Sequence, residues 1–267
     1  MLYKRYAFLL ALLAAADAVA GPSEWKIEKS KHFIVYYHGD ESVAKGTVEK
    51  AEGYYRDILR ELGLKRYDDF WLWDKRVQIR IYDSLADFRT ATGSPAWAGG
   101  KASYVSRQIE GVKGENDFLE GLLPHEMTHL IFRDYIGFAG DVPLWLEEGV
   151  ASWVAASRRD EDMATVQVLH SAGKLFPLDK LVSMDVKEMA SAARARQFYA
   201  QSATLVAFLM QNGGSDQFAV FCRELRDNKA VDQALKSAYG ERLGSVAKLE
   251  AEWLLWLPGK STERVRS

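Results

Sequence analysis

The sequence lacks several features that would place the protein in a specialised structural class. It has one cysteine, Cys222, in 267 residues, so no disulfide can form within the chain. It also has no excess of basic charge, since 35 Lys and Arg residues face 37 Asp and Glu residues. Nucleic acid is therefore not expected as a partner. A hydrophobic fraction of 48% indicates a globular fold that depends on its core for stability.

Residues 1–20 have a different character from the rest of the chain. Lys4 and Arg5 precede the apolar stretch AFLLALLAAA, and the small residues AVA (18–20) follow it. This layout is typical of a secretory signal peptide. The alternative is an uncleaved anchor, but the stretch is shorter than the roughly 20 residues of a membrane-spanning helix, and Asp17 lies at its end. We expect an exported bacterial protein, periplasmic or secreted, with no stable membrane insertion after cleavage.

The remaining chain changes from strand patterns to helix patterns near residue 117. Strands are expected at 32–37, 77–82 and 96–109, and helices at 42–62, 118–134, 143–157, 196–211, 216–226, 231–239 and 246–256. A short helix is also expected to follow the second strand, through Phe88. Gly99 and Gly100 interrupt the third strand, which suits a bulge or a close backbone approach. Strands followed by helices indicate an α+β fold with two lobes.

The segment LLPHEMTHLIF (122–132) places two histidines and a glutamate in apolar surroundings. On a helix, His125 and His129 share one face and lie about 6 Å apart along the axis, so both imidazoles can bind one Zn²⁺. Glu126 points about 100° away, beside the metal, where a general base can act on a zinc-activated water. Pro124 implies either a kink in this helix or a helix that begins late.

A catalytic zinc site needs a third protein ligand and an open fourth position. The stretch VPLWLEEGVASW (142–153) offers Glu147 and Glu148 in apolar surroundings, on a helix that Pro143 opens. Eighteen residues separate His129 from Glu148, which leaves room for a loop and a returning helix. Gly149 would allow the two helices to approach closely. Either glutamate could be the ligand on these grounds.

HEMTH, 18 residues and then WLEEGVA resemble the gluzincin metallopeptidases, the thermolysin and aminopeptidase-N branch of the peptidase MA clan. The similarity is greatest to the small bacterial peptidase MA-like domains. It implies one Zn²⁺ per chain held by His125, His129 and Glu148, with Glu126 as catalytic base. Glu148 is preferred because the ligand in this family directly precedes glycine. Glu147, where the aminopeptidase branch has asparagine, would then pack at the helix surface or support the ligands.

The same resemblance implies a zincin-like α+β catalytic domain. Residues 21–260 would form it, with a sheet-containing part (21–117, a mixed sheet with helices), a helical lobe (118–260) and the active site in the cleft between them. Residues 261–267 would be a loose tail. In QFYAQSATLVAFL (197–209), Tyr199 followed by Ser202 resembles the family helix whose tyrosine donates a hydrogen bond to the oxyanion. The alternative for Tyr199 is a plain core aromatic.

Several positions depart from related patterns. Metzincins would have a glycine at Phe132 and a histidine at Tyr135, so that class is excluded. AWAGGKASY (96–104) lacks the acid with which aminopeptidases bind a free amino terminus. Ser152 stands where thermolysin-like enzymes have an aspartate that orients a histidine. The partners of the zinc histidines are therefore not implied by the resemblance.

The expected activity is a zinc-dependent peptide-bond hydrolase of the HExxH-x18-E gluzincin type, an endopeptidase acting on peptide or protein substrates. A silent binding module of the same fold and a hydrolase of cell-wall peptide crosslinks are the alternatives. His32 and His38 flank a strand and are expected to be surface or packing residues. His170 is a further candidate near the site. The sequence does not indicate the oligomeric state.

Overall fold

The computed structural model describes residues 25–64, 71–94, 100–114, 118–138, 142–155, 159–189 and 191–257. The expected signal peptide and the expected C-terminal tail lie outside these residues. The chain divides into two compact units at a boundary that falls after Leu130, and residues 61–63 group with the second unit. Within the described ranges, no helix combines the length and the apolar character that crossing a membrane requires.

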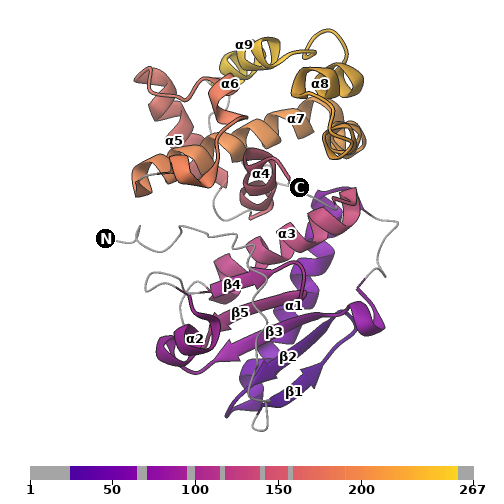
Figure 1. The fold of residues 1–267 in the computed structure, drawn as a ribbon, viewed down its shortest axis with the longest axis vertical. Coiled ribbons are helices and arrows are strands. Elements are labelled where there is room, and N and C mark those ends of the chain that lie inside the picture. The colour runs from indigo at the N-terminus through magenta and orange to yellow at the C-terminus, as the bar shows by residue number, and fades with distance from the viewer. Residues whose placement is uncertain are drawn as a thin grey trace. The chain divides into compact units, whose positions relative to one another are not determined.

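The first unit contains a five-stranded mixed sheet (Figure 1). Its strands are β1 (Lys26–Lys29), β2 (Phe33–Tyr37), β3 (Val77–Tyr82), β4 (Gly100–Ser103) and β5 (Gln108–Val112), in the order β1-β2-β3-β5-β4. The central strands β2, β3 and β5 run parallel, and β1 and β4 pair antiparallel at the two edges. The expected α+β class with a mixed sheet is confirmed, whereas the expected cleft between two lobes stays a prediction.

Helix α1 (Glu41–Glu61) packs on the sheet through the side that its sequence spacing predicts. Its buried residues recur at three- and four-residue intervals: Ala44, Thr47, Ala51, Tyr55, Ile58 and Leu59. The Tyr55 ring lies edge-on to Phe33 of β2 at 6.3 Å and packs against Trp71 at 5.2 Å. A short 3-10 turn, η1 (Trp73–Lys75), precedes β3, and α2 (Leu85–Thr92) follows it. The expected helices at 42–62 and through Phe88 are confirmed.

The single strand expected at 96–109 is wrong in its described part. The chain instead forms the hairpin β4–β5, which reverses at a turn over residues 104–107. Arg107 has φ 52° there, a left-handed backbone conformation that is uncommon for residues other than glycine. The sequence therefore gives no indication of this turn. Gly99 lies outside the described residues. Gly100 does lie at a close approach, because a Cβ on it would overlap the Leu122 side chain and lie 2.9 Å from the Glu110 carbonyl oxygen.

The second unit is helical. Its elements are α4 (Leu144–Val154), α5 (Arg159–Ser171), α6 (Leu178–Leu181), the 3-10 turn η4 (Val186–Glu188), α7 (Ala192–Arg226), α8 (Val231–Tyr239) and α9 (Val246–Trp256). Helix α7 is central, since α4, α5 and α8 all pack on it. Its backbone breaks at Gly214 (φ 68°, ψ −178°), which separates the two helices expected at 196–211 and 216–226. Helices α5 and α6 lie outside the helix ranges that were expected from the sequence.

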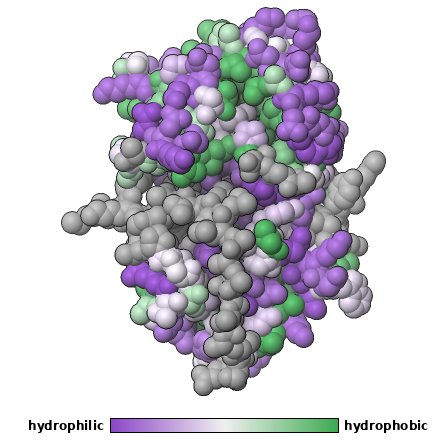
Figure 2. Space-filling model, in the orientation of Figure 1, coloured by the Kyte–Doolittle hydropathy of each residue, from purple (hydrophilic) through white to green (hydrophobic). Residues whose placement is uncertain are grey.

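The surface of the second unit matches this packing. Figure 2 shows hydrophilic residues over α5 and α8, with apolar residues visible between them. Amphipathic helices that turn their apolar sides toward a shared central helix produce such a pattern. Along α7, sixteen residues are buried, including Phe198, Phe208 and Phe221.

Helix α3 (Leu123–Ile136) carries the HExxH segment, and a π-helical turn, η2 (Phe118–Leu122), leads into it. The unit boundary after Leu130 falls within α3, so its first turns belong to the first unit and its last turns to the second. At its end, Gly137 takes up a left-handed conformation (φ 80°), the usual way to stop a helix. Arg226 of α7 donates from Nη1 to the Ile136 carbonyl oxygen at 2.8 Å.

A buried histidine joins β2 to α1. The Glu52 carboxylate accepts a hydrogen bond from the His32 backbone N–H at 3.0 Å and one from His32 Nδ1 at 2.7 Å. The His32 ring also stacks on Tyr55, with ring centroids 4.1 Å apart. Burial alone would raise the pKa of Glu52, but the hydrogen bonds from His32 and Ser30 outweigh it and lower the pKa to about 2. His32 is therefore a packing residue, one of the two roles expected for it.

The Glu52 contacts predict a pH-dependent contribution to stability. Because the folded-state pKa lies below the ordinary value of 4.5, the carboxylate stabilises the fold above about pH 4.5 and loses this effect as the pH falls toward 2. Glu52→Gln should lower the free energy of unfolding by roughly 1–3 kcal/mol at neutral pH, and the difference from wild type should shrink between about pH 5 and pH 2. Urea unfolding at several pH values measures it. Glu49→Gln, an exposed position on the same helix, is the control; an equal effect there would contradict the prediction.

Candidate metal centre

Pro124 is the second residue of α3 and determines how this helix begins. A proline has no backbone N–H and its ring crowds the carbonyl four residues earlier, so a regular helix across 118–134 would be strained. The structure places the wider π-turn η2 before the proline and begins the α-helix at Leu123. Of the two alternatives from the sequence, the late α-helical start is the observed one. It sets His125 in the first turn of a regular helix.

The π-turn η2 is held in place by the rest of the first unit. Glu120 accepts hydrogen bonds from Lys50 and Tyr54 of α1, the latter at 2.9 Å. On the sheet side, Gly111 of β5 lies against the Phe118 ring, so closely that a Cβ there would overlap the ring. The same holds for Gly100 of β4 and the Leu122 side chain. The sheet and α1 therefore fix where α3 begins.

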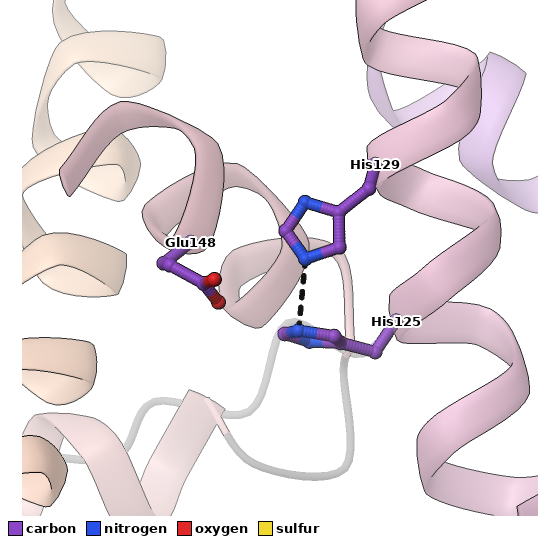
Figure 3. A group of neighbouring side chains, drawn as sticks. All are labelled: His125, His129 and Glu148. Carbon is purple, nitrogen blue, oxygen red and sulfur yellow. Dashed lines mark hydrogen bonds between the residues drawn. The ribbon is translucent and has the colours of Figure 1, made fainter. Parts of the chain in front are cut away.

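His125 and His129 face each other on α3, as their four-residue spacing predicts. Their Nε2 atoms lie 3.1 Å apart, and their rings are nearly perpendicular at 83° (Figure 3). Each residue is only 8% exposed. Two buried imidazoles whose Nε2 atoms face a common point can supply two of the four ligands of a tetrahedral metal site.

Glu148 on α4 completes a three-residue group with these histidines. One ligand atom from each residue lies within 4.8 Å of the other two, and all three residues are buried. Figure 3 shows the Glu148 carboxylate directed toward the two imidazoles. Glu148 is 1% exposed, which is costly for a carboxylate unless a cation or a set of hydrogen-bond donors compensates it.

The donor set fits zinc. Neutral imidazole nitrogen and carboxylate oxygen are ordinary zinc ligands, at about 2.0–2.2 Å from the ion, which puts tetrahedral ligand atoms about 3.3 Å apart. The 3.1 Å separation of the two Nε2 atoms is close to that spacing. Three protein ligands also match a catalytic zinc site, in which a fourth position stays open.

Glu147, the other glutamate considered as a ligand, has an arginine as its partner. Its carboxylate accepts two hydrogen bonds from Arg133 of α3, from Nε at 2.5 Å and from Nη2 at 3.2 Å. Glu147 is 3% exposed, so it does not lie at the helix surface. Of its two expected roles, packing at the surface is wrong. Glu148, and not Glu147, joins the histidines.

Gly149 allows a close helix approach, but between other helices than expected. The close contact is between α4 and α7: a Cβ on Gly149 would lie 2.7 Å from the Ser202 carbonyl oxygen and 2.9 Å from Val206 Cγ2. Tyr199 lies on α7 one helical turn before Ser202, half-buried, with its ring against Phe198. Tyr199 therefore belongs to the helix segment that packs beside Glu148.

The remaining candidates are separate from the three-residue group. Glu126 lies on α3 next to His125 and is 4% exposed, but it is not a member of the group. His170 is half-buried in the last turn of α5 and does not join it either. His38 packs its ring against Trp25 at 3.9 Å in the first unit, a packing role as expected. Ser152 is buried on α4.

Arg133 was not among the residues expected at the site. Its signal was nevertheless present, since His125, His129 and Arg133 follow one another at four-residue spacing and therefore share one face of α3. An arginine one turn beyond two candidate ligands, with a second glutamate beside the third candidate, is compatible with an ion pair between the same two helices. Periodicity within a single helix does not reveal such a pair.

Comparison with known proteins agrees with this geometry. No curated protein matches the chain. A family model described as the Peptidase MA superfamily matches residues 71–259, which include all three residues of the candidate metal centre. The match covers well over half of the chain, so the protein belongs to the Peptidase MA superfamily, a zincin-like peptidase family.

Proposed function

We propose that the protein is a zinc-dependent peptide-bond hydrolase that cleaves peptide or protein substrates internally. The observation that carries this proposal is the buried convergence of His125, His129 and Glu148 in a chain of a peptidase superfamily. We also propose that it acts after export, in the periplasm or outside the cell, because residues 1–20 have the layout of a signal peptide.

The chain's own residues supply the proton chemistry. Zinc at this centre would lower the pKa of a coordinated water toward about 7 and polarise the substrate carbonyl. Glu126 follows His125 in α3, about 100° around the helix, and is buried beside the centre. Its carboxylate would accept the proton of the attacking water and then donate it to the leaving amine. His125, His129 and Glu148 would hold the ion and leave one side open.

Tyr199 and β4 are the proposed substrate-contacting elements. The Tyr199 hydroxyl would donate a hydrogen bond to the oxyanion that forms as the carbonyl is attacked. Strand β4 is an edge strand of the described sheet and packs through Gly100 against Leu122, at the start of α3. A substrate backbone could add to this edge as a further strand. Without an acid in AWAGGKASY, recognition of a free amino terminus is not part of the proposal.

The metal-binding roles lead to a stoichiometry prediction. Purified protein should contain one zinc per chain, and His125→Ala, His129→Ala or Glu148→Gln should each reduce it well below one, because two ligands hold zinc weakly. Glu147→Gln, the adjacent control, should stay near one at saturating zinc, because its carboxylate faces Arg133. Elemental analysis after dialysis against a buffer that keeps free zinc saturating, with the zinc of the buffer subtracted, measures this. If Glu147→Gln loses the metal and Glu148→Gln retains it, Glu147 is the ligand.

Glu126 should serve catalysis without holding the metal. Glu126→Gln keeps the size and polarity of the side chain but removes the proton acceptor, so turnover of a cleavable peptide should fall at least roughly 10²-fold with zinc retained. A peptide-library assay and elemental analysis on the same sample test both parts. Full activity in this variant would refute the mechanism. Wild-type protein that binds zinc but cleaves nothing would favour a binding module, and cleavage of cell-wall peptides alone would identify crosslinks as the substrate.

Tyr199→Phe separates a catalytic from a packing role for Tyr199. Loss of an oxyanion donor typically costs about 2.7–4 kcal/mol, so turnover should fall roughly 10²- to 10³-fold. The Michaelis constant should change far less, because the charge exists only in the transition state. Kinetics and the melting temperature are measured on one sample. Unchanged turnover with a small loss of stability would assign Tyr199 to the core.

A further inference from the structure

Arg133 and Glu147 form a buried, bidentate ion pair between α3 and α4. The two hydrogen bonds, at 2.5 and 3.2 Å, use both carboxylate oxygens and two guanidinium nitrogens. The side chains are 12% and 3% exposed. A planar guanidinium that meets a carboxylate through two parallel bonds tolerates little rotation or sliding, so such a pair fixes geometry more strictly than a single contact between charges.

The ion pair lies directly beside the candidate metal centre. Arg133 is one helical turn beyond His129 on the same face of α3, and Glu147 immediately precedes Glu148 on α4. The two helices that supply the ligands are thus the two helices that the pair connects. A slip of α4 by one residue would move it about 1.5 Å and rotate it about 100°. Such a slip would take Glu148 away from the histidines.

We propose that Arg133 and Glu147 are positioning residues that set Glu148 as the third metal ligand and thereby raise the affinity of the site. This inference rests on the proposed metal centre and adds a determinant of how tightly it binds. Both partners belong to the second compact unit, which contains α4 and the end of α3. Groups that orient metal ligands typically change metal affinity 10- to 100-fold when they are removed.

The experiment uses Co²⁺ as a spectroscopic probe of the metal-free, full-length protein. Titration gives the affinity and stoichiometry, and the visible absorption bands report the coordination geometry, which a purely structural role would not alter. The test variant is the double substitution Arg133→Met with Glu147→Gln, because removing both charges avoids leaving one of them buried and uncompensated. We expect Co²⁺ affinity to fall 10- to 100-fold, with one ion bound at saturation and a changed spectrum.

Arg133→Lys distinguishes geometry from charge. Lysine keeps the positive charge but cannot form two parallel hydrogen bonds, so its affinity should also fall. If this variant binds Co²⁺ as tightly as wild type, with the same spectrum, strict positioning is refuted. This variant also keeps the inference testable if the double variant does not fold, because its buried carboxylate stays compensated.

Arg223→Met is the matched control. Arg223 also anchors the end of α3, through a hydrogen bond from Nη2 to the Tyr135 hydroxyl at 3.3 Å, but it contacts neither Glu147 nor Glu148 in any described interaction. It should leave Co²⁺ affinity within about twofold of wild type. An equal loss in this control, or an unchanged affinity in the double variant, would overturn the inference. Wild-type protein that binds no Co²⁺ would instead overturn the metal centre itself.

Discussion

Burying ionisable groups in α3 and α4 has a cost in free energy that the surrounding elements must offset. Three glutamates and two histidines in these helices are at most 8% exposed: His125, Glu126, His129, Glu147 and Glu148. Apolar side chains alternate with them, and Met127, Leu146 and Val150 are fully buried. Charges in such surroundings destabilise a fold unless each has a partner. Arg133 compensates one carboxylate, and a cation between the histidines and Glu148 would compensate another.

The backbone around α3 is arranged to meet this constraint at both ends of the helix. At the start, the π-turn absorbs Pro124, and Gly100 and Gly111 let the hairpin β4–β5 lie directly against Leu122 and Phe118. At the end, Arg226 binds the Ile136 carbonyl oxygen. A helix held at both ends keeps its side chains in a fixed direction. The candidate ligands on α3 are therefore held in fixed directions, which would reduce the reorganisation needed to bind an ion.

Local patterns predicted the parts of the structure that depend on neighbours in sequence. The spacing of His125 and His129 and the alternation of β3 follow from helix and strand geometry. The preference for Glu148 over Glu147 came instead from the family resemblance. The hairpin β4–β5 was missed because no Asn-Gly or Asp-Gly pair marks its turn, and Arg107 adopts a left-handed backbone that glycine would have signalled. Strand β1 (KIEK) is too short and polar to show a pattern, although pairing with β2 orders it.

The partner of Glu147 was missed for a different reason. Adjacent glutamates on one helix differ by about 100° in direction, so only the position of α3 decides which of them meets the histidines. That position is a property of the assembled helices α3, α4 and α7. In the same way, Gly149 was recognisable as a close-approach residue, but the helix that it accommodates, α7, is far away in sequence. The residue types indicated that Glu147 needs a partner and that Gly149 lies at a close helix contact. Which residue or helix makes each contact is determined only by the tertiary packing.

The number of ligands bears on whether the centre is catalytic or structural. Structural zinc sites are closed by four protein ligands, whereas catalytic sites keep one position for water or substrate. In the described part of the chain, three residues form the group. Glu126 is buried next to His125 yet lies outside the group, which is compatible with its proposed role as a proton acceptor. A site built only for stability gains nothing from a further buried carboxylate such as Glu126, since it adds a desolvation cost. The burial of Glu126 beside His125 therefore supports the proposed catalytic role of the centre over a purely structural one.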